Sequence, residues 1–316
     1  PFLPSIARQQ LIALNPNLVT GDNVDDVLRR LHRVQPNLAG NESFLKALRG
    51  VWTVYDPAEK RERNLTLIDF EHPDRNDFTF TQELPFVDYD RRRMDMVIFI
   101  NGFPVVVVEN KSPTVTEPEL EAFEQVQCVY TERVPEFLKF VQFFAACDIR
   151  LHYSATWNDN LRAFYRWKAD GKDYGLERLS KTLFDQTHLL RILQDYLIFF
   201  RADDQTQKYI LRPHQMRAAE RIVQRVATSL SPPPNLGEGP GERAKTGLIW
   251  HTQGSGKTLT MIIAAHKLRR LETLENPTIL IVVDRRELET QMVQNLEAFG
   301  FPMVVSARSK KHLREL

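Results

Sequence analysis

The spacing of apolar residues divides the first part of the chain into a helical stretch and a β-rich stretch. Apolar residues recur every three or four positions near the start, which predicts helices at 6–14, 24–31 and 42–48. Asp22 stands where the second of these helices would take its N-terminal cap. From residue 51 the period shortens, which predicts short strands at 51–55, 64–70, 78–81, 96–100 and 103–108. Helices are predicted at 117–130 and 179–200, on either side of an apolar strand at 140–146.

The last part of the chain alternates strands with helices. Strands are predicted at 247–251, 278–284 and 303–306, and helices at 257–271 and 286–299. This rhythm predicts an α/β fold with a parallel sheet. Residues 231–245, rich in proline and glycine, are predicted to form an exposed loop before it. We therefore expect two domains, 1–200 and 201–316.

Composition excludes several classes of protein. With 42% apolar and 26% charged residues the chain is expected to be globular. The longest apolar stretch, 96–108, is interrupted by polar residues and proline and is too short for a membrane span. No leader segment is recognised, so a cytoplasmic protein is expected. Cys128 and Cys147 lack the spacing of a disulfide framework or of a zinc site.

Charge is unevenly distributed along the chain. Residues 205–316 hold 17 Lys/Arg and 10 Asp/Glu, a balance of +7, whereas 1–204 hold 25 and 31, a balance of −6. A basic half suits contact with phosphate groups. The net charge of +1 does not by itself indicate binding to nucleic acid.

A glycine-rich turn lies between a predicted strand and a predicted helix. Its sequence, typical of a phosphate-binding loop, is His251-Thr252-Gln253-Gly254-Ser255-Gly256-Lys257-Thr258. Gly254 and Gly256 let backbone amides turn toward an anion at the helix N-terminus. Lys257 would contact the β- and γ-phosphates of ATP, and Thr258 would bind Mg²⁺. His251 replaces the first glycine of the strict pattern, where the turn only begins. The alternative is a glycine-rich turn with an incidental lysine, which the flanking strand and helix disfavour.

Neighbouring residues extend this candidate nucleotide site. Arg212 and Gln215 lie upstream, and Gln215 could contact the edge of an adenine, although a solvated glutamine is the alternative. Asp284 either lies at the carboxyl edge of the sheet, where ligands bind, or simply begins a helix. No later strand supplies the acidic residue that positions Mg²⁺ and water, and no arginine finger is found. We predict that this chain binds nucleotide but does not turn it over.

Asp95, Glu109 and Lys111 form a second candidate site. Asp95 and Glu109 would hold Mg²⁺ for phosphodiester hydrolysis, and Lys111 would place a cation near the attacking water or the scissile phosphate. Glu109 and Lys111 lie two apart on a predicted strand and therefore share a face. The run 105–108 is apolar throughout, which predicts a buried strand whose charged end needs a partner or a metal. The alternative is an ion pair of Glu109 or Asp95 with Lys111 or Arg93.

The hairpin between these residues decides whether the two carboxylates meet. Asn101-Gly102 predicts a tight turn. A regular two-residue turn pairs Asp95 with Val108 and separates the carboxylates onto opposite faces. A three-residue loop, or a bulge near Pro104, pairs Asp95 with Glu109 on one face. We predict the shifted register.

Several segments together resemble the nuclease domain of the R (restriction) subunits of type I restriction–modification enzymes. They are Asn41-Glu42-Ser43-Phe44, Leu67-Ile68-Asp69-Phe70, Asn76-Asp77-Phe78, the run 93–104 and Glu109-Asn110-Lys111-Ser112-Pro113. The run 249–261 is similar to the first helicase motif of these subunits, and the run 284–288 to the next motif. Arg212 and Gln215 resemble their adenine-reading segment. The resemblance covers nearly the whole chain.

The resemblance implies a PD-(D/E)xK (RecB-like) nuclease domain followed by the first part of a RecA-like motor domain of superfamily 2. It implies Mg²⁺ and ATP as cofactors and cleavage of double-stranded DNA, coupled in the full subunit to ATP-dependent translocation. It also implies docking on separate modification and specificity subunits. The family often carries Q-x-x-x-Y on the next helix, whereas here Gln125 is followed by Val129, and Tyr130 comes one place late. Packing is therefore our interpretation of Tyr130.

Two other classes of function remain open at this point. The nuclease-like fold could be inert and serve only to bind DNA or partner subunits. The chain could also be another phosphate-loop enzyme, such as a small-molecule kinase. The long segment before the loop, with its own carboxylate pair, disfavours the kinase.

Overall fold

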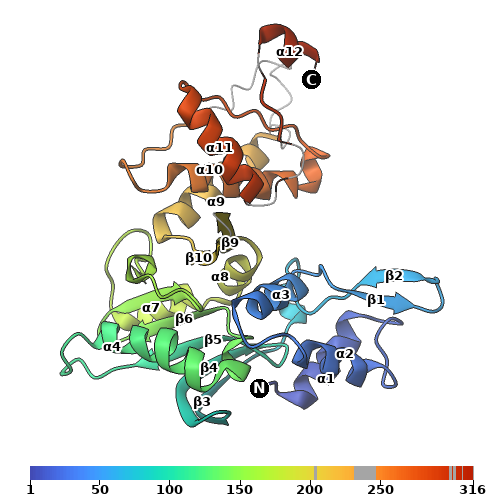
Figure 1. Cartoon of the computed structure of the whole chain (residues 1–316), viewed down its shortest axis with the longest axis vertical. Coiled ribbons are helices and arrows are strands. Elements are labelled where there is room, and N and C mark those ends of the chain that lie inside the picture. Colours follow the sequence, from blue (N-terminus) through green and yellow to red (C-terminus); the bar gives the residue numbers. More distant parts are fainter. Residues whose placement is uncertain (203–204, 231–246, 299–300, 302–303, 308, 316) are drawn as a thin grey trace, which may run out of the picture. The chain divides into compact units, whose positions relative to one another are not determined.

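In a computed structural model the chain forms two compact units, each of which is described by itself. The structure describes residues 1–202, 205–230, 247–298, 301, 304–307 and 309–315 (Figure 1). The first unit contains Pro1–Ile198 and Lys208–Ile210, and the second contains Phe199–Gln207 and Leu211–Leu316. The predicted loop 231–245 lies outside the described residues. Within the described ranges, no helix has the length and apolar character that crossing a membrane requires.

The first unit begins with the three helices that the sequence predicts. They are α1 (Pro4–Leu14), α2 (Val24–His32) and α3 (Leu38–Leu48). The prediction that Asp22 caps α2 is wrong. Asn23 occupies the cap position, and its side-chain oxygen accepts the amide of Thr20 instead of a helix amide. Helix α3 begins earlier than predicted because the Asn37 side chain accepts the amide of Gly40 and so caps the first turn.

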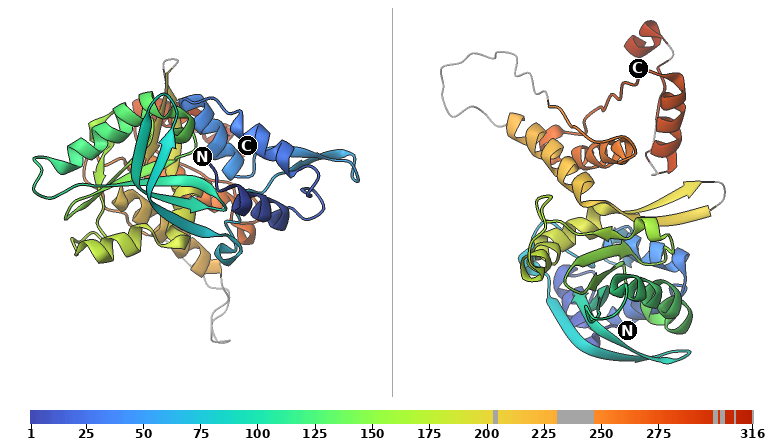
Figure 2. Two further views of the ribbon diagram at one scale, coloured as in Figure 1. Left: turned by 90° about the horizontal axis from the view of Figure 1, so that it is seen from below. Right: turned by 90° about the vertical axis from the view of Figure 1, so that its left-hand side faces the viewer.

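A two-stranded antiparallel arm follows these helices (Figures 1 and 2). Its strands are β1 (Thr53–Asp56) and β2 (Arg61–Asn64). The predicted strand at 64–70 is therefore wrong beyond Asn64. The Asn15 side chain donates to the carbonyl of Thr66 and accepts its amide, both at 2.8 Å. One buried side chain thus satisfies the backbone groups that a neighbouring strand would otherwise pair.

A six-stranded mixed sheet forms the centre of the first unit, in the order β3-β4-β5-β6-β7-β8. The strands are β3 (Phe78–Val87), β4 (Arg91–Ile100), β5 (Phe103–Asn110), β6 (Phe143–Cys147), β7 (Leu151–Ala155) and β8 (Tyr165–Arg166). Strands β5 and β6 run parallel, and the other neighbours pair antiparallel. A parallel pair needs a long crossover. Here it is helical, through α4 (Pro118–Glu124), the π-helical turn η2 (Gln125–Tyr130), α5 (Thr131–Arg133) and α6 (Pro135–Leu138).

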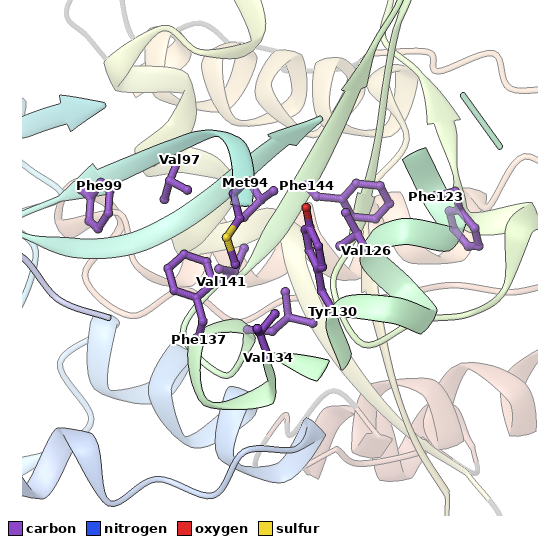
Figure 3. Packing of buried hydrophobic residues seen from close by; sticks show 12 residues of the cluster. Met94, Val97, Phe99, Phe123, Val126, Tyr130, Val134, Phe137, Val141 and Phe144 are labelled. Atoms are coloured by element: carbon purple, nitrogen blue, oxygen red, sulfur yellow. The ribbon is translucent and has the colours of Figure 1, made fainter. Parts of the chain in front are cut away.

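Apolar side chains of this crossover cover one face of the sheet. Figure 3 shows the buried cluster that they form with the strands. Its members are Met94, Val97, Phe99, Val107, Phe123, Val126, Tyr130, Val134, Phe137, Leu138, Val141 and Phe144. On the other face, Trp167 packs edge-on against Tyr153 and donates to Thr182 of helix α7 (Leu176–Leu183). Because both faces are covered, Val105–Val108 of β5 are fully or almost fully buried, as predicted.

The predicted helix at 179–200 is broken into four elements. After α7 come α8 (Gln186–Arg191), the π-helical turn η4 (Ile192–Tyr196) and strand β9 (Leu197–Ala202), which pairs with β10 (Gln205–Ile210). The break has a local cause, because the Asp185 side chain accepts the amide of His188 and so starts a new helix.

The second unit is mainly helical in its described residues. Its helices are α9 (Pro213–Leu230), α10 (Lys257–Arg269), η5 (Glu272–Leu274), α11 (Arg286–Ala298) and α12 (Lys310–Glu315). The strands predicted at 247–251 and 278–284 are not formed, and the described part of 303–306 is not a strand either. A buried parallel strand needs a hydrogen-bonded neighbour on each side. No such partner pairs with these segments among the described residues, and Trp250 remains 86% exposed.

Candidate active site and phosphate-binding loop

The hairpin between β4 and β5 has the shifted register that the sequence predicts. Pairing runs Ile100 with Phe103, Phe99 with Pro104, Ile98 with Val106 and Val97 with Val107. The shift therefore comes from a bulge and not from a three-residue loop. Val105 is the extra residue, next to a proline that has no amide to donate to the ladder. Continued one step beyond the pair of Met96 with Val108, this register places Asp95 opposite Glu109.

The two carboxylates differ in their surroundings. Asp95 is half-buried, and its Oδ2 accepts the backbone amide of Asn110 at 2.8 Å. This bond ties the Asp95 side chain to the end of β5. Glu109 is completely buried. A carboxylate so placed needs hydrogen-bond donors or a cation around it.

Hydrogen bonds and burial together set the ionisation of Glu109. Its Oε2 accepts Nε2 of Gln125, and its Oε1 accepts the hydroxyl of Tyr130, both at 2.8 Å. Burial raises the pKa of Glu109 to about 7, and the negative charge of Asp95 adds to the rise. The hydroxyl of Tyr130 and the charge of Lys111 act in the opposite direction. A bound cation would favour the ionised form further.

Lys111 completes the group of three that the sequence singles out. Its Nζ donates to Oε1 of Gln125 and lies 2.9 Å from Oε1 of Glu121, while its side chain is 15% exposed. Arg93 pairs with Glu83 at 3.5 Å. The ion-pair alternative would place Lys111 or Arg93 beside Asp95 or Glu109. Instead, Lys111 is paired with Glu121, and Arg93 is paired with Glu83. Gln125 joins Lys111 to the buried carboxylate through its two amide ends.

The role of Tyr130 goes beyond the packing that we expected. Tyr130 is buried in the core cluster, but its hydroxyl also accepts Nε2 of Gln125 at 2.6 Å. Residues Gln125–Tyr130 form a π-helical turn, in which hydrogen bonds run from i to i+5 instead of i to i+4. Such a turn holds one more residue than an α turn. It therefore brings Gln125 and Tyr130 onto one side although they are five residues apart.

The carboxylate pair is chemically suited to Mg²⁺. This ion is commonly bound by one or two carboxylates, and water completes its octahedral shell. Asp95 and Glu109 could supply those ligands, and a carboxyl whose pKa is raised by burial, as that of Glu109 is, is common at functional sites. Among the described residues, no group of three or more His, Cys, Asp or Glu side chains is arranged to hold a metal ion. The pair alone would therefore have to carry it.

The glycine-rich turn of the second unit has loop geometry. Gly254 and Gly256 have φ values of 74° and 82°, which favour glycine, and helix α10 begins at Lys257. Lys257 is exposed and Thr258 is half-buried. The Ser255 amide donates within the loop to the carbonyl of Thr252 at 3.3 Å, and its hydroxyl donates to the same oxygen at 2.7 Å.

Gln215 lies against this loop. Its Oε1 accepts the backbone amide of Arg212 at 2.8 Å, and its Nε2 donates to the carbonyl of Gly256 at 3.2 Å. With 3% exposure it is not the solvated glutamine of the alternative interpretation. His214, which the sequence did not single out, lies 3.0 Å from the carbonyl of Ser255 through Nε2. Asp284 is an exposed residue two positions before the first residue of α11.

Comparison with known proteins gives two family matches. Residues 3–160 match the type I restriction enzyme R protein N terminus, and residues 214–316 match the SWI2/SNF2 ATPase. The chain is 33% identical over 264 residues to a putative type I restriction enzyme MjaVIIP endonuclease subunit of Methanocaldococcus jannaschii, which covers 79% of this chain and 23% of that protein. It is 29% identical over 309 residues to the type I restriction enzyme HindI endonuclease subunit of Haemophilus influenzae, covering 92% and 28%.

The chain thus spans between a fifth and a third of the length of these relatives. The R protein match begins just before α1 and ends after β7, so it contains the carboxylate pair, Lys111 and the π-helical turn. The ATPase match contains the whole glycine-rich turn. With half of its 316 residues matched by that first model, the chain belongs to the type I restriction enzyme R protein family.

Proposed function

We propose that the first unit is a PD-(D/E)xK endonuclease domain that cleaves double-stranded DNA with Mg²⁺. The observation that supports this proposal is the bulge at Val105, because the shifted register, continued one step beyond Met96 and Val108, would set Asp95 opposite Glu109. Gln125 then holds Lys111 beside them. Two acidic side chains at the end of one hairpin and an ammonium group beside them are what hydrolysis of a phosphodiester requires. The named relatives, all endonuclease subunits, support the same reaction class.

Each residue has a distinct part in this proposal. Asp95 and Glu109 would bind the ion, which when bound supplies a Lewis acid and lowers the pKa of water. Tyr130 and Gln125 orient the Glu109 carboxylate through one hydrogen bond to each of its oxygens. Lys111 presents a partly shielded ammonium group that would stabilise negative charge developing on the phosphate. Gln125 fixes the distance between that charge and the carboxylate.

For the second unit we propose ATP binding at the glycine-rich turn, as the opening part of a RecA-like motor. Gly254, Gly256 and Lys257 would hold the phosphates, and Thr258 would bind Mg²⁺. The SWI2/SNF2 ATPase match supports this assignment. In the full subunit, ATP-dependent translocation of DNA and docking on modification and specificity subunits would follow from membership of the family.

The nuclease proposal is tested with plasmid DNA, Mg²⁺ and the full subunit. Glu109→Gln and Lys111→Met are expected to lower nicking at least about a hundredfold, the usual effect of removing a group that stabilises the transition state. Glu121→Gln is the matched control, because it removes the exposed ion-pair partner of Lys111 and leaves the cluster with Glu109 in place. Unchanged nicking by Lys111→Met would favour the alternative of an inert, DNA-binding or partner-binding domain.

A further inference from the structure

The hairpin of β3 and β4 continues past the region where β4 pairs with β5. Pairing of β4 with β5 ends at Met96 and Val108, whereas pairing of β4 with β3 goes on as far as Arg91. Residues 91–94 of β4 therefore pair with β3 alone. Asp95, a ligand in the proposed metal site, comes directly after this two-stranded extension.

Contacts with the helical crossover hold the extension in place. Phe86, near the end of β3, packs against the buried cluster of the first unit. At the turn, Oδ2 of Asp88 accepts the amide of Glu136 at 3.0 Å, and the amide of Asp90 donates to the carbonyl of Arg133 at 3.3 Å. Because the turn is bonded to the crossover at two points, its position relative to Asp95 is fixed within the first unit.

Three consecutive arginines at the start of β4 have different surroundings. Arg92 donates to Oδ2 of Asp90 at 2.6 Å. Arg93 lies 3.5 Å from Glu83, but the two side chains are 63% and 69% exposed, and an ion pair so exposed contributes little. Arg91 is exposed, and among the described residues no carboxylate pairs with its guanidinium group. Because residues two apart on a strand share a face, Arg91 and Arg93 present two cations on one face of the hairpin.

The two cations lie on the same strand as the proposed metal site. Asp95 is two residues from Arg93 and four from Arg91, which is about 7 and about 14 Å along an extended strand. A DNA strand carries a phosphate about every 3.4 Å of helix axis, so a strand cut beside Asp95 would pass further phosphates within that distance. The planar group of arginine can donate two parallel hydrogen bonds to a phosphate. Tyr89 in the turn is 77% exposed, so this end of the hairpin is open to a ligand.

We propose that Arg91 and Arg93 bind backbone phosphates of double-stranded DNA next to the phosphate that is cut, and so align the strand with Asp95 and Glu109. The proposal rests on the endonuclease function proposed above. Contacts to phosphates position a protein on DNA but carry no sequence information. The hairpin would therefore hold any duplex, whatever its sequence. Its continuity with the proposed metal site favours DNA over an acidic protein surface as the partner.

The test is binding of the full subunit to a short fluorescent duplex, measured by anisotropy in EDTA at several salt concentrations. EDTA removes the metal, so binding is read without cleavage. The double variant Arg91→Gln, Arg93→Gln should reduce the slope of log K against log salt by about 1.8, because each phosphate contact contributes about 0.9. Over a fourfold rise in salt, the natural protein should therefore lose about tenfold more affinity than this variant.

Two further variants control for charge and for folding. Arg91→Lys, Arg93→Lys keeps both positive charges and should keep the natural slope. Arg29→Gln, Lys181→Gln removes two exposed cations elsewhere in the first unit, each paired with a carboxylate of its own helix. This matched control should also keep the natural slope. An equal loss of slope in the control would overturn the proposal, because the effect would then be one of net charge.

An unchanged slope in Arg91→Gln, Arg93→Gln would also overturn the proposal. If that variant keeps its slope but assembles less well with the modification subunit in size-exclusion chromatography, the two arginines dock a protein and not DNA. Failure of the endonuclease function is a separate result. If Lys111→Met leaves nicking unchanged while the glutamine variant loses its slope, the DNA contact stands and only its link to cleavage is refuted.

Discussion

Replacing Glu109 by glutamine tests the electrostatics of the proposed site without any nuclease assay. The buried carboxyl has a pKa of about 7 in the folded chain and an ordinary value of 4.5. Because the folded state holds the proton more tightly, the natural protein is expected to lose stability as pH rises from about 4.5 to 7. The rise in the pKa of Glu109 from 4.5 to about 7 corresponds to about 3 kcal/mol of lost stability at pH 8. Glu109→Gln carries no charge and should not show this loss.

The measurement is urea unfolding in EDTA at pH 5 and pH 8, followed by tryptophan fluorescence. Trp157 and Trp167 report on the first unit. We expect the stability of Glu109→Gln relative to the natural protein to rise by about 2.5 kcal/mol between the two pH values, because part of the loss has already occurred at pH 5. Mg²⁺ should recover more stability at pH 8 in the natural protein than in Glu109→Gln, because only the natural protein has both carboxylates of the pair to bind it.

A constant difference between Glu109→Gln and the natural protein at both pH values would refute the reasoning. It would mean that Glu109 titrates in the folded state as it does in the unfolded chain. Glu121→Gln provides the matched control, since the Glu121 side chain is 53% exposed. Its relative stability should not change by more than a few tenths of a kcal/mol between pH 5 and pH 8.

Three further predictions concern other contacts. Tyr130→Phe removes a hydrogen bond to the Glu109 carboxylate, so the pKa of Glu109 should rise further. The pH midpoint of Mn²⁺ binding, measured by calorimetry, should then move up by about one pH unit. Gly256→Ala should weaken binding of a fluorescent ADP analogue about tenfold or more, because Gly256 has a φ of 82° and an added Cβ would meet the Gln215 side chain. Gly247→Ala, where an added Cβ meets open space, should leave that binding unchanged. Asn15→Ala should destabilise the first unit by about 2 kcal/mol in thermal or urea melts, because it leaves the backbone amide and carbonyl of Thr66 without a hydrogen-bond partner. An unchanged melt would contradict this prediction.

The hairpin shows how far sequence reasoning reaches into the site. Side chains of a strand alternate between faces, so Asp95 and Glu109 can meet only if the regular turn at Asn101-Gly102 is offset by one residue. That requirement, with the missing amide of Pro104, predicted the irregularity. It did not distinguish a longer loop from a bulge. The choice depends on packing around residues 105–108 of β5, and the pattern of residues does not encode that packing.

Other elements could not be predicted because their cause is distant along the chain. Thr66 avoids a strand through a side chain 51 residues away, and spacing rules do not include such contacts. The strands expected in the second unit depend on neighbours to pair with, so an apolar run alone does not form them. The spacing of Gln125 and Tyr130 was judged against an α-helix. In a single π-helical turn, the residue that shares a side with Gln125 comes one position later than in an α-helix.

Both irregularities in the proposed site are insertions of one residue. One acts on Glu109 and the other on Tyr130, and these two side chains are hydrogen-bonded to each other. The bulge in β5 turns Glu109 toward Asp95, and the π turn in the crossover turns Tyr130 toward Glu109. Without the bulge, β5 would turn the Glu109 side chain to the other face of the sheet, away from the hydroxyl of Tyr130. Regularising the helical turn alone would leave a buried carboxylate with one donor fewer. The two departures from regular geometry therefore act on the same hydrogen bond, and the buried carboxylate of Glu109 benefits from both.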